Sequence, residues 1–426
     1  MRTKKTIFSQ IMSLVSRYDF QKCVDRYKGD WHAKTLTCID QFKIMSFAQF
    51  TDRSSLRDIE MTLESCGKGL YHAGLRTVSK STLAEANEKR NWMIYRDFAQ
   101  ILIKWAKELY RDDYFRLGLN EMVYALDSTS IRICLELSPW AEFHHGEGCV
   151  KMHTLIDLRG SIPSYIVMTN GLVHDSKVMP MIPVEEQAFY LMDKGYIFFK
   201  QLYECFHLKH AYFVTRAKDN MLYNVIEEYE VDKSTGLISD QLICLTGLKP
   251  SVQYPEPIRM VVYEDYTTGN VYRFLTNNLT IDSLTVAELY RERWSVELFF
   301  RWIKQHLHIK KFYGTTENAV YLQLWIAVCD YLLLIIAKKH FNIPQSLHTI
   351  SKSIGPLLFK QDDIHSIFKV TKELSINSPK SQFRGLPILR YYPDTIKKSM
   401  SNQTSDNNKR IAKNTILLYF RMIFMM

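Results

Sequence analysis

The chain has 426 residues, of which 46% are hydrophobic, 13% aromatic and 23% charged. This composition excludes a disordered, collagen-like or small disulfide-stapled protein, and the length predicts roughly two to four structural units. The 55 Lys and Arg residues exceed the 45 Asp and Glu residues, and a net charge of +10 weakly favours an anionic partner such as nucleic acid or an acidic membrane.

The eight cysteines include no C-x-x-C pair, which argues against a zinc ribbon or a thioredoxin-like motif. We interpret them as reduced thiols of a cytosolic protein without a signal peptide. The apolar segment 319–337 contains Gln323 and Asp330 at mid-depth. These polar residues favour a buried helix over a membrane span, so we expect no membrane partner.

Residues 1–115 are polar and more basic than acidic, with few strand-like alternations. Ser55 and Ser79 stand where helix caps are expected, so this part predicts a helical N-terminal domain. Its charge makes it a candidate DNA-binding domain. A solvated helical bundle with no such role accounts for the same pattern equally well.

A different pattern begins near residue 120. Helix-like segments lie near 174–182 and 198–208, and strand-like apolar runs occupy 122–126, 151–158, 164–168, 188–192 and 211–215. Three strands followed by alternating helices and strands predict a sheet covered by helices.

Residues 219–270 alternate β-branched and aromatic side chains and predict a β-rich insertion with a hairpin running into 271–275. A long helix is predicted from Thr285, which with Glu288 forms a capping box, to about 306. We therefore divide the chain into a domain of 1–115, a catalytic domain of 116–218 and 271–340, the insertion 219–270, and a C-terminal helical region with a basic tail over 341–426.

Two acids, Asp127 and Asp193, each end an apolar run. Open α/β sheets bind ligands outside such strand ends, although a single Asp there often only begins a turn. The predicted long helix offers a third acid, Glu297. Tyr290, Arg293, Glu297, Arg301 and Lys304 fall on one stripe of this helix.

The apolar stripe of the same helix comprises Leu289, Val296, Phe300 and Ile303, so the helix can pack on the sheet and hold Glu297 at its rim. The alternative is a surface helix with solvated Arg–Glu pairs. Trp294 and Trp302 are interpreted as helix-packing residues.

Three carboxylates at one rim repel one another, and hard divalent cations resolve this repulsion. Two Mg²⁺ ions, for which Mn²⁺ can substitute, would activate an attacking oxygen and stabilise the leaving one in phosphoryl transfer. The acid-free run 298–316, with its Lys310, Lys311 and His308, would suit DNA phosphates. His174 and Asp175 could be a metal-proximal pair, but we favour a capping role for Asp175.

These residues resemble the IS4 family of insertion-sequence transposases. The resemblance rests on the run Asp127-Ser-Thr, the run Asp193-Lys-Gly-Tyr196, and the Tyr-(2)-Arg-(3)-Glu-(6)-Lys signature at Tyr290, Arg293, Glu297 and Lys304. It implies an α/β, ribonuclease-H-like mixed sheet with flanking helices, a β-rich insertion before the helix that carries the glutamate, and an N-terminal helical domain.

The resemblance further implies a catalytic, metal-binding triad of Asp127, Asp193 and Glu297, with Tyr290, Arg293 and Lys304 on the DNA backbone. It implies cut-and-paste movement through a hairpin intermediate at paired terminal inverted repeats of double-stranded DNA, strand transfer into target DNA, a homodimer, and a cytoplasmic, nucleoid-associated location in a bacterium. Relatives stack a flipped base on a Trp of the insertion, but this chain has no Trp between 141 and 293, so either a Tyr or Phe takes its place or this detail differs.

Two other functions fit the residues. One is a nuclease or junction resolvase on the same fold, which would nick DNA without strand transfer. The other is a catalytically inactive DNA-binding remnant. This alternative stays open because the sequence beyond about 380 differs from the usual C-terminal sequence of the family.

Overall fold

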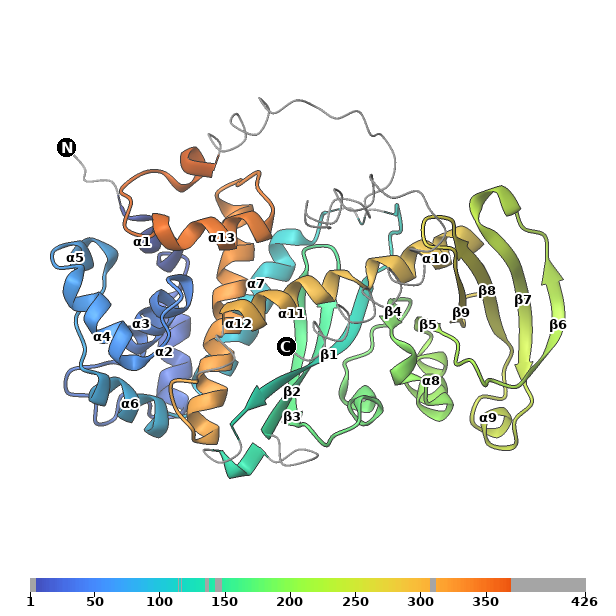
Figure 1. Cartoon of the computed structure of the whole chain (residues 1–426), viewed down its shortest axis with the longest axis horizontal. Coiled ribbons are helices and arrows are strands. Elements are labelled where there is room, and N and C mark those ends of the chain that lie inside the picture. Colours follow the sequence, from blue (N-terminus) through green and yellow to red (C-terminus); the bar gives the residue numbers. More distant parts are fainter. Residues whose placement is uncertain are drawn as a thin grey trace, which may run out of the picture. The chain divides into compact units, whose positions relative to one another are not determined.

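The computed structural model describes residues 5–113, 115, 117–134, 138–141, 148–306 and 312–368 (Figure 1). The expectations for His308, Lys310, Lys311 and the tail from 369 onward lie outside these residues. The eight cysteines are all described and all are free thiols.

The N-terminal part is helical, as predicted. Hydroxyl groups of Thr6, Ser16, Thr37, Ser55 and Ser79 accept hydrogen bonds from backbone N–H groups at five helix starts, so the predicted caps at Ser55 and Ser79 are confirmed. The helices are α1 (Ile7–Met12), α2 (Arg17–Arg26), α3 (Cys38–Phe50), α4 (Leu56–Ser65), α5 (Gly69–Ala73), α6 (Lys80–Lys89) and α7 (Met93–Tyr110).

Nine strands form one sheet in the order β3-β2-β1-β4-β5-β9-β8-β7-β6. The first three in the chain pair antiparallel, and β4 and β5 run parallel to β1, which is the ribonuclease-H-like arrangement. Their bounds are β1 (Val123–Ile133), β2 (Gly148–Asp157), β3 (Ile162–Asn170), β4 (Phe189–Met192) and β5 (Tyr212–Arg216).

The predicted β-rich insertion is confirmed, and it extends the same sheet. It comprises β6 (Tyr223–Tyr229), β7 (Leu237–Leu245), the short helix α9 (Leu248–Gln253) and β8 (Ile258–Asp265). The predicted hairpin joins β8 to β9 (Asn270–Thr276), and β9 pairs with β5. Through β9 the insertion strands are hydrogen-bonded to β5, which lies next to β4 in the sheet (Figure 1).

Different helices cover the two faces of the sheet. Tyr124 and Leu126 of β1 share a core with α8 (Phe199–Cys205) and the 3₁₀ helix η3 (Asp175–Met181). The alternate residues Ala125 and Ile131 point to the other face and pack with the long C-terminal helices. Those helices are α11 (Ser295–His306), α12 (Glu317–His340) and α13 (Leu347–Leu357).

The predicted long helix is two helices, which corrects the sequence interpretation. The first, α10 (Ser283–Glu292), is capped by Asp282, so the capping box at Thr285 is wrong. Around Arg293 and Trp294 the backbone N–H groups bond three residues back, from Arg293 to Tyr290 and from Trp294 to Arg291. This tightened turn separates α10 from α11 and changes the direction of the side chains that follow.

Helix α12 is the segment predicted as a buried helix. Among the described residues it is the one helix long and apolar enough to cross a membrane, with mean hydropathy 2.0, but 94% of that window is buried inside the protein. Asp330 in its middle is fully buried, as are the neighbouring apolar residues. α12 is therefore a core helix that packs against α7, α3 and α6.

Candidate active site

Two of the three predicted acids lie side by side at one edge of the sheet. Leu126 of β1 pairs with Met192 of the parallel strand β4. The residues that come next are Asp127 and Asp193, so both acids lie at the same level on neighbouring strands. The apolar runs predicted that each acid ends its strand, which is correct for Asp193 after β4 but not for Asp127, because β1 continues to Ile133.

Asp127 faces α11 and is bound from two sides. The Nη1 of Arg293 lies 3.1 Å from its Oδ2, and the Ser128 backbone N–H donates to its Oδ1 at 2.8 Å. Burial raises the pKa of Asp127 to about 6, and the charges of Glu297 and Asp193 add to that rise, whereas Arg293 opposes it. The carboxyl is thus crowded by like charges and held by one cation.

Asp193 is the N-cap of a short 3₁₀ turn formed by 194–196, and its Oδ1 accepts the Lys194 backbone N–H at 2.7 Å. The Tyr290 hydroxyl of α10 donates to the same oxygen at 3.4 Å. The other oxygen, Oδ2, has no hydrogen bond to the described residues. Because the cap fixes the side chain, this oxygen has a defined position at the sheet edge.

Glu297 lies in the first turn of α11 and is partly buried. Its charge acts on Asp127, Arg293 and Lys304, which places it at the same edge as the two aspartates. Within the described part of the chain, however, no three His, Cys, Asp or Glu side chains are close enough together to hold a metal ion. The three acids share one region, and Arg293 lies against Asp127.

The other residues of the predicted stripe, Tyr290, Arg293, Arg301 and Lys304, differ in their exposure to solvent. Tyr290 and Arg293 are each 8% exposed, and the Arg293 guanidinium lies 5.5 Å from the centre of the Tyr290 ring. Arg301 and Lys304 are exposed on α11. The helix break separates Tyr290 from Glu297, so the single continuous stripe predicted from the sequence is wrong. The predicted apolar stripe is confirmed, since its residues are buried: Leu289, Val296, Phe300 and Ile303.

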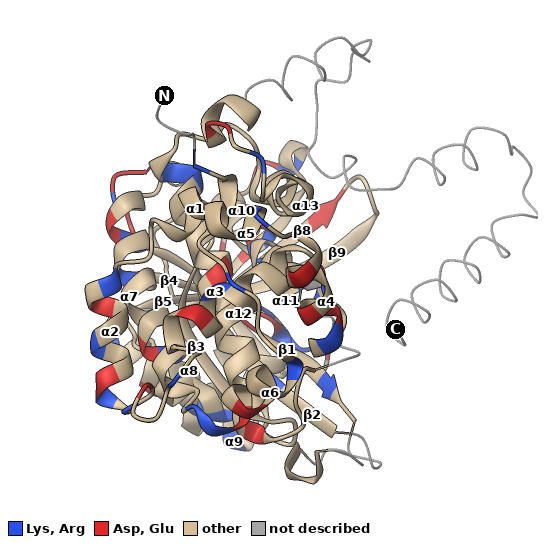
Figure 2. Cartoon of the chain, turned by 90° about the vertical axis from the view of Figure 1, so that its left-hand side faces the viewer, with Lys and Arg blue, Asp and Glu red and all other residues tan. Residues whose placement is uncertain are grey.

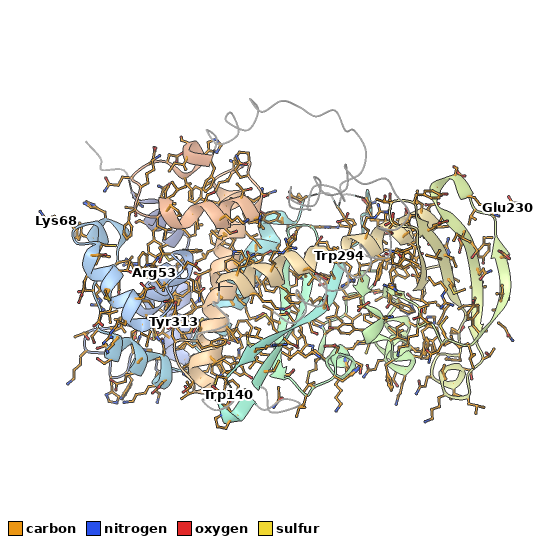
Figure 3. The ribbon with its side chains drawn as sticks, viewed as in Figure 1. Arg53, Lys68, Trp140, Glu230, Trp294 and Tyr313 are labelled. Carbon is orange, nitrogen blue, oxygen red and sulfur yellow. The ribbon has the colours of Figure 1, made fainter. Side chains whose placement is uncertain are left out.

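Trp302 packs in the core, as predicted, but Trp294 does not. Trp294 is 60% exposed at the junction of α10 and α11 (Figure 3). Its ring lies 5.8 Å from the guanidinium carbon of Arg293. An exposed indole therefore lies next to the part of the sheet that carries Asp127 and Asp193, called here the acidic edge. Helical periodicity alone could not reveal this, because it treats 283–306 as one helix.

Asp175 has a different role from the one predicted. His174 caps η3, whereas Asp175 accepts a 2.6 Å hydrogen bond from the Ser128 hydroxyl and lies 2.9 Å from the Lys151 ammonium. The His153 ring is 3.4 Å away and buried. These partners hold the pKa of Asp175 well below its ordinary value although burial opposes them. Asp175 thus ties β1 to β2 on the face opposite Asp127.

The sequence analysis missed Arg216. It ends β5, and its partner in β9 is Phe274. The signal that identified Asp127 and Asp193, a polar residue directly after an apolar run, also applies to Arg216, but only the strand order shows that β5 is the neighbour of β4.

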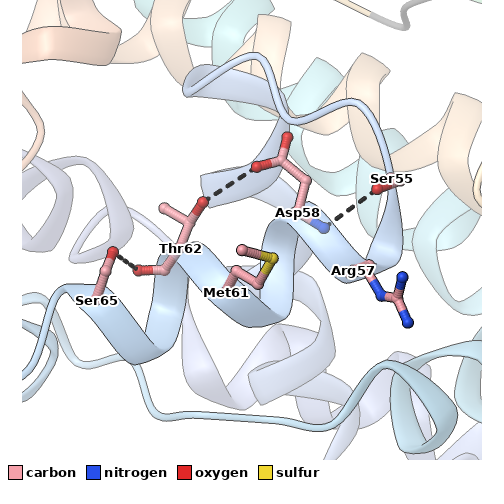
Figure 4. Close-up of a pocket in the computed structure, with 6 residues that line it drawn as sticks. All are labelled: Ser55, Arg57, Asp58, Met61, Thr62 and Ser65. Carbon is pink, nitrogen blue, oxygen red and sulfur yellow. Dashed lines mark hydrogen bonds between the residues drawn. The ribbon is translucent and has the colours of Figure 1, made fainter.

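A hollow of another kind lies on α4 in the N-terminal helices (Figure 4). The Ser55 hydroxyl accepts the Asp58 N–H at 3.1 Å, and the Thr62 hydroxyl donates to Asp58 at 3.3 Å. Because its polar groups bond to one another, we assign no function to it. It is lined by Ser55, Arg57, Asp58, Met61, Thr62 and Ser65.

Comparison with known proteins identifies the family of the chain. Residues 119–333 match the transposase DDE domain, and residues 3–76 match a domain family of unknown function, DUF4372. A Sinorhizobium fredii protein named as a transposase is 32% identical over 289 residues, covering 67% of this chain and 79% of that protein.

Two further relatives are named for insertion sequences. A Geobacillus stearothermophilus protein, named as a transposase for element IS5377, is 32% identical over 267 residues, or 62% of this chain and 68% of that protein. A Synechocystis protein, named as a transposase for element IS4SA, is 27% identical over 328 residues, or 74% of this chain and 87% of that protein. The chain belongs to the DDE transposases, enzymes that act on DNA.

Proposed function

We propose that this transposase excises an insertion sequence of the IS4 family and inserts it into target DNA by cut-and-paste phosphoryl transfer. The substrates are the terminal inverted repeats and a target duplex. The observation that carries the proposal is the register of Asp127 and Asp193 on neighbouring parallel strands, with Glu297 acting on the same edge from α11.

The carboxylates of Asp127, Asp193 and Glu297 would hold two Mg²⁺ ions, and Mn²⁺ could replace them. The donor set fits, because carboxylate oxygens are the ligands that Mg²⁺ prefers. Burial raises the pKa of Asp127 and the neighbouring acids add to the rise, and a divalent cation would offset the part that comes from those acids. When bound, such ions activate the attacking oxygen and stabilise the leaving oxygen.

Four residues contact the DNA backbone near the cleaved end in this proposal: Tyr290, Arg293, Arg301 and Lys304. Arg301 and Lys304 are exposed on the helix that carries Glu297, so a phosphate can reach them from solvent. Tyr290 and Arg293 are buried against the aspartates, and they act at the innermost phosphate.

Trp294 replaces the insertion tryptophan of the relatives as the aromatic that stacks on an unpaired base. Its exposure beside Arg293 supports this role, since stacking needs one free ring face. A duplex with 2-aminopurine near the cleaved end tests it. Trp294→Ala is expected to remove the fluorescence change that marks stacking, and Trp302→Phe serves as a control in the core.

The remaining assignments complete the complex. Residues 1–115 form a DNA-binding domain, 341–426 form a C-terminal region whose sequence ends in a basic tail, and two copies act together on paired ends. On the side of the N-terminal helices seen in Figure 2, basic and acidic residues are interspersed. This mixture favours a modest contribution of charge to DNA affinity there. The protein acts at the bacterial nucleoid in the cytoplasm.

The full-length protein, a linear duplex carrying both inverted repeats and MgCl₂ provide the test. Asp127→Asn, Asp193→Asn and Glu297→Gln are each expected to abolish cleavage, whereas Glu288→Gln on α10 leaves it intact. Cleavage that survives all three substitutions overturns the proposal. Nicking without strand transfer selects a nuclease or resolvase instead, and binding of the ends without turnover selects an inactive remnant.

A further inference from the structure

Arg216 extends the row of charged residues at the acidic edge. Thr215 of β5 pairs with Met192 of the parallel strand β4. The residues that follow are Arg216 and Asp193, so Asp127, Asp193 and Arg216 occupy one level on three neighbouring strands. A cation therefore stands beside two acids at the level where β4 and β5 end and β1 continues to Ile133.

A row of aromatic rings holds Arg216 on the face that carries the acids. Its guanidinium carbon lies 5.2 Å from the centre of the Tyr272 ring, which stacks on Phe274 at 6.0 Å. The Phe274 ring in turn lies 4.8 Å from Tyr290, whose hydroxyl reaches Asp193. Burial raises the pKa of Tyr290 to about 12, and the charge of Arg216 opposes that rise.

Among the described residues, no carboxylate forms an ion pair with Arg216. Arg293 pairs with Asp127 at 3.1 Å and Arg273 with Asp219 at 3.6 Å. In the part of the chain that the structure describes, no Asp or Glu lies within ion-pair distance of Arg216, although it is partly buried. Partial burial of an unpaired cation is costly, and a bound anion would remove that cost.

We propose that Arg216 binds a backbone phosphate of the DNA strand that lies across the acidic edge. Guanidinium groups bind phosphate through two parallel N–H donors, and stacking on a ring leaves those in-plane donors free. Arg216 adds a positive charge at this site beside Arg293, which is paired with Asp127. The inference rests on the proposed function, because it needs DNA at this edge.

The test measures the binding of the full-length protein to a duplex that carries the terminal inverted repeat, in metal-free buffer over a range of salt concentrations. Arg216→Gln is expected to weaken binding about tenfold and to reduce the slope of log affinity against log salt by about 1. Arg216→Lys keeps the charge and is expected to restore the slope. Lys200→Gln, on α8 of the opposite face, removes an exposed charge and leaves the slope unchanged.

Several outcomes separate this inference from the proposed function. A wild-type slope in Arg216→Gln, at an unchanged unfolding temperature, overturns the role of Arg216 even if the wild-type protein cleaves DNA. If Arg216→Gln does not fold, Arg216→Met keeps the packing on Tyr272 and gives the same comparison. Cleavage that persists in Asp127→Asn, Asp193→Asn and Glu297→Gln instead overturns the proposed function and leaves the binding result standing.

Discussion

The Arg293 guanidinium lies 3.1 Å from the carboxylate of Asp127, so a cation from the junction of α10 and α11 neutralises this acid. Arg293 is 8% exposed, and its Nε has no hydrogen-bond partner in the described residues. In the metal-free protein this cation offsets the repulsion among Asp127, Asp193 and Glu297.

Replacement of Arg293 should make the fold depend more on metal. In Arg293→Gln the acids lose their internal cation, so we expect a lower unfolding temperature without metal and a larger rise on addition of MgCl₂ than in the wild type. Thermal unfolding with and without MgCl₂ measures both. Arg291→Gln, two residues earlier on α10, is the control, and an equal rise in Arg293→Gln and wild type would contradict the expectation.

Metal binding should weaken in acid. Because burial raises the pKa of Asp127 to about 6, its carboxyl is protonated below that pH and ionised above it. Protons therefore compete with Mg²⁺ on the acid side, and the apparent affinity should fall by about tenfold per pH unit below the pKa. Titration of Mn²⁺ by calorimetry measures this dependence. Asp219→Asn, at an exposed acid, should retain it, and an affinity that is constant over this range would refute it.

The strands and their acids were predictable from the sequence, because short apolar runs bounded by turn residues are typical of buried strands. Asp127 and Asp193 follow apolar runs that the structure places in the adjacent parallel strands β1 and β4. The sequence could not show that β5 lies next to β4, since that adjacency depends on long-range pairing. For that reason Arg216 was missed.

The helix break was also beyond the sequence. Residues 283–306 contain neither Gly nor Pro and keep a helical period throughout. The tightened turn at Arg293 coincides with its ion pair to Asp127, a contact 166 residues away along the chain. Local helix propensity predicts a continuous helix over these residues, whereas the observed break occurs where Arg293 makes its long-range contact. The exposure of Trp294 follows from the same turn.

The ion pair of Asp175 with Lys151 should contribute measurably to stability. Their side chains are 24% and 16% exposed, and Asp175 also accepts the Ser128 hydroxyl. Asp175→Ala leaves the ammonium without its acid, so we expect a loss of about 3 kcal/mol in the free energy of unfolding. Urea unfolding measures it. In the double variant Asp175→Ala with Lys151→Met the loss should be smaller than the sum of the single losses, and simple additivity would show that the pair does not interact.

Asp330 should make the protein less stable as the pH rises. It is fully buried in α12, both carboxylate oxygens lack hydrogen-bond partners among the described residues, and burial raises its pKa well above the ordinary value. The folded state thus keeps a proton that the unfolded state loses near its ordinary pKa. The stability from this proton is complete below the unfolded pKa and is lost as the pH rises through the folded pKa, by about 1.4 kcal/mol per pH unit between the two.

Asp330→Asn removes this titration while keeping the shape of the side chain. We expect the variant to equal the wild type in acid and to become more stable than it as the pH rises toward neutrality, as measured by urea unfolding across that range. Asp112→Asn is the control, because Asp112 is 94% exposed and its replacement should not change the slope. A constant difference between Asp330→Asn and wild type at every pH would mean that Asp330 is ionised in the folded protein, which a carboxylate without partners in this core could sustain only at a cost of several kcal/mol.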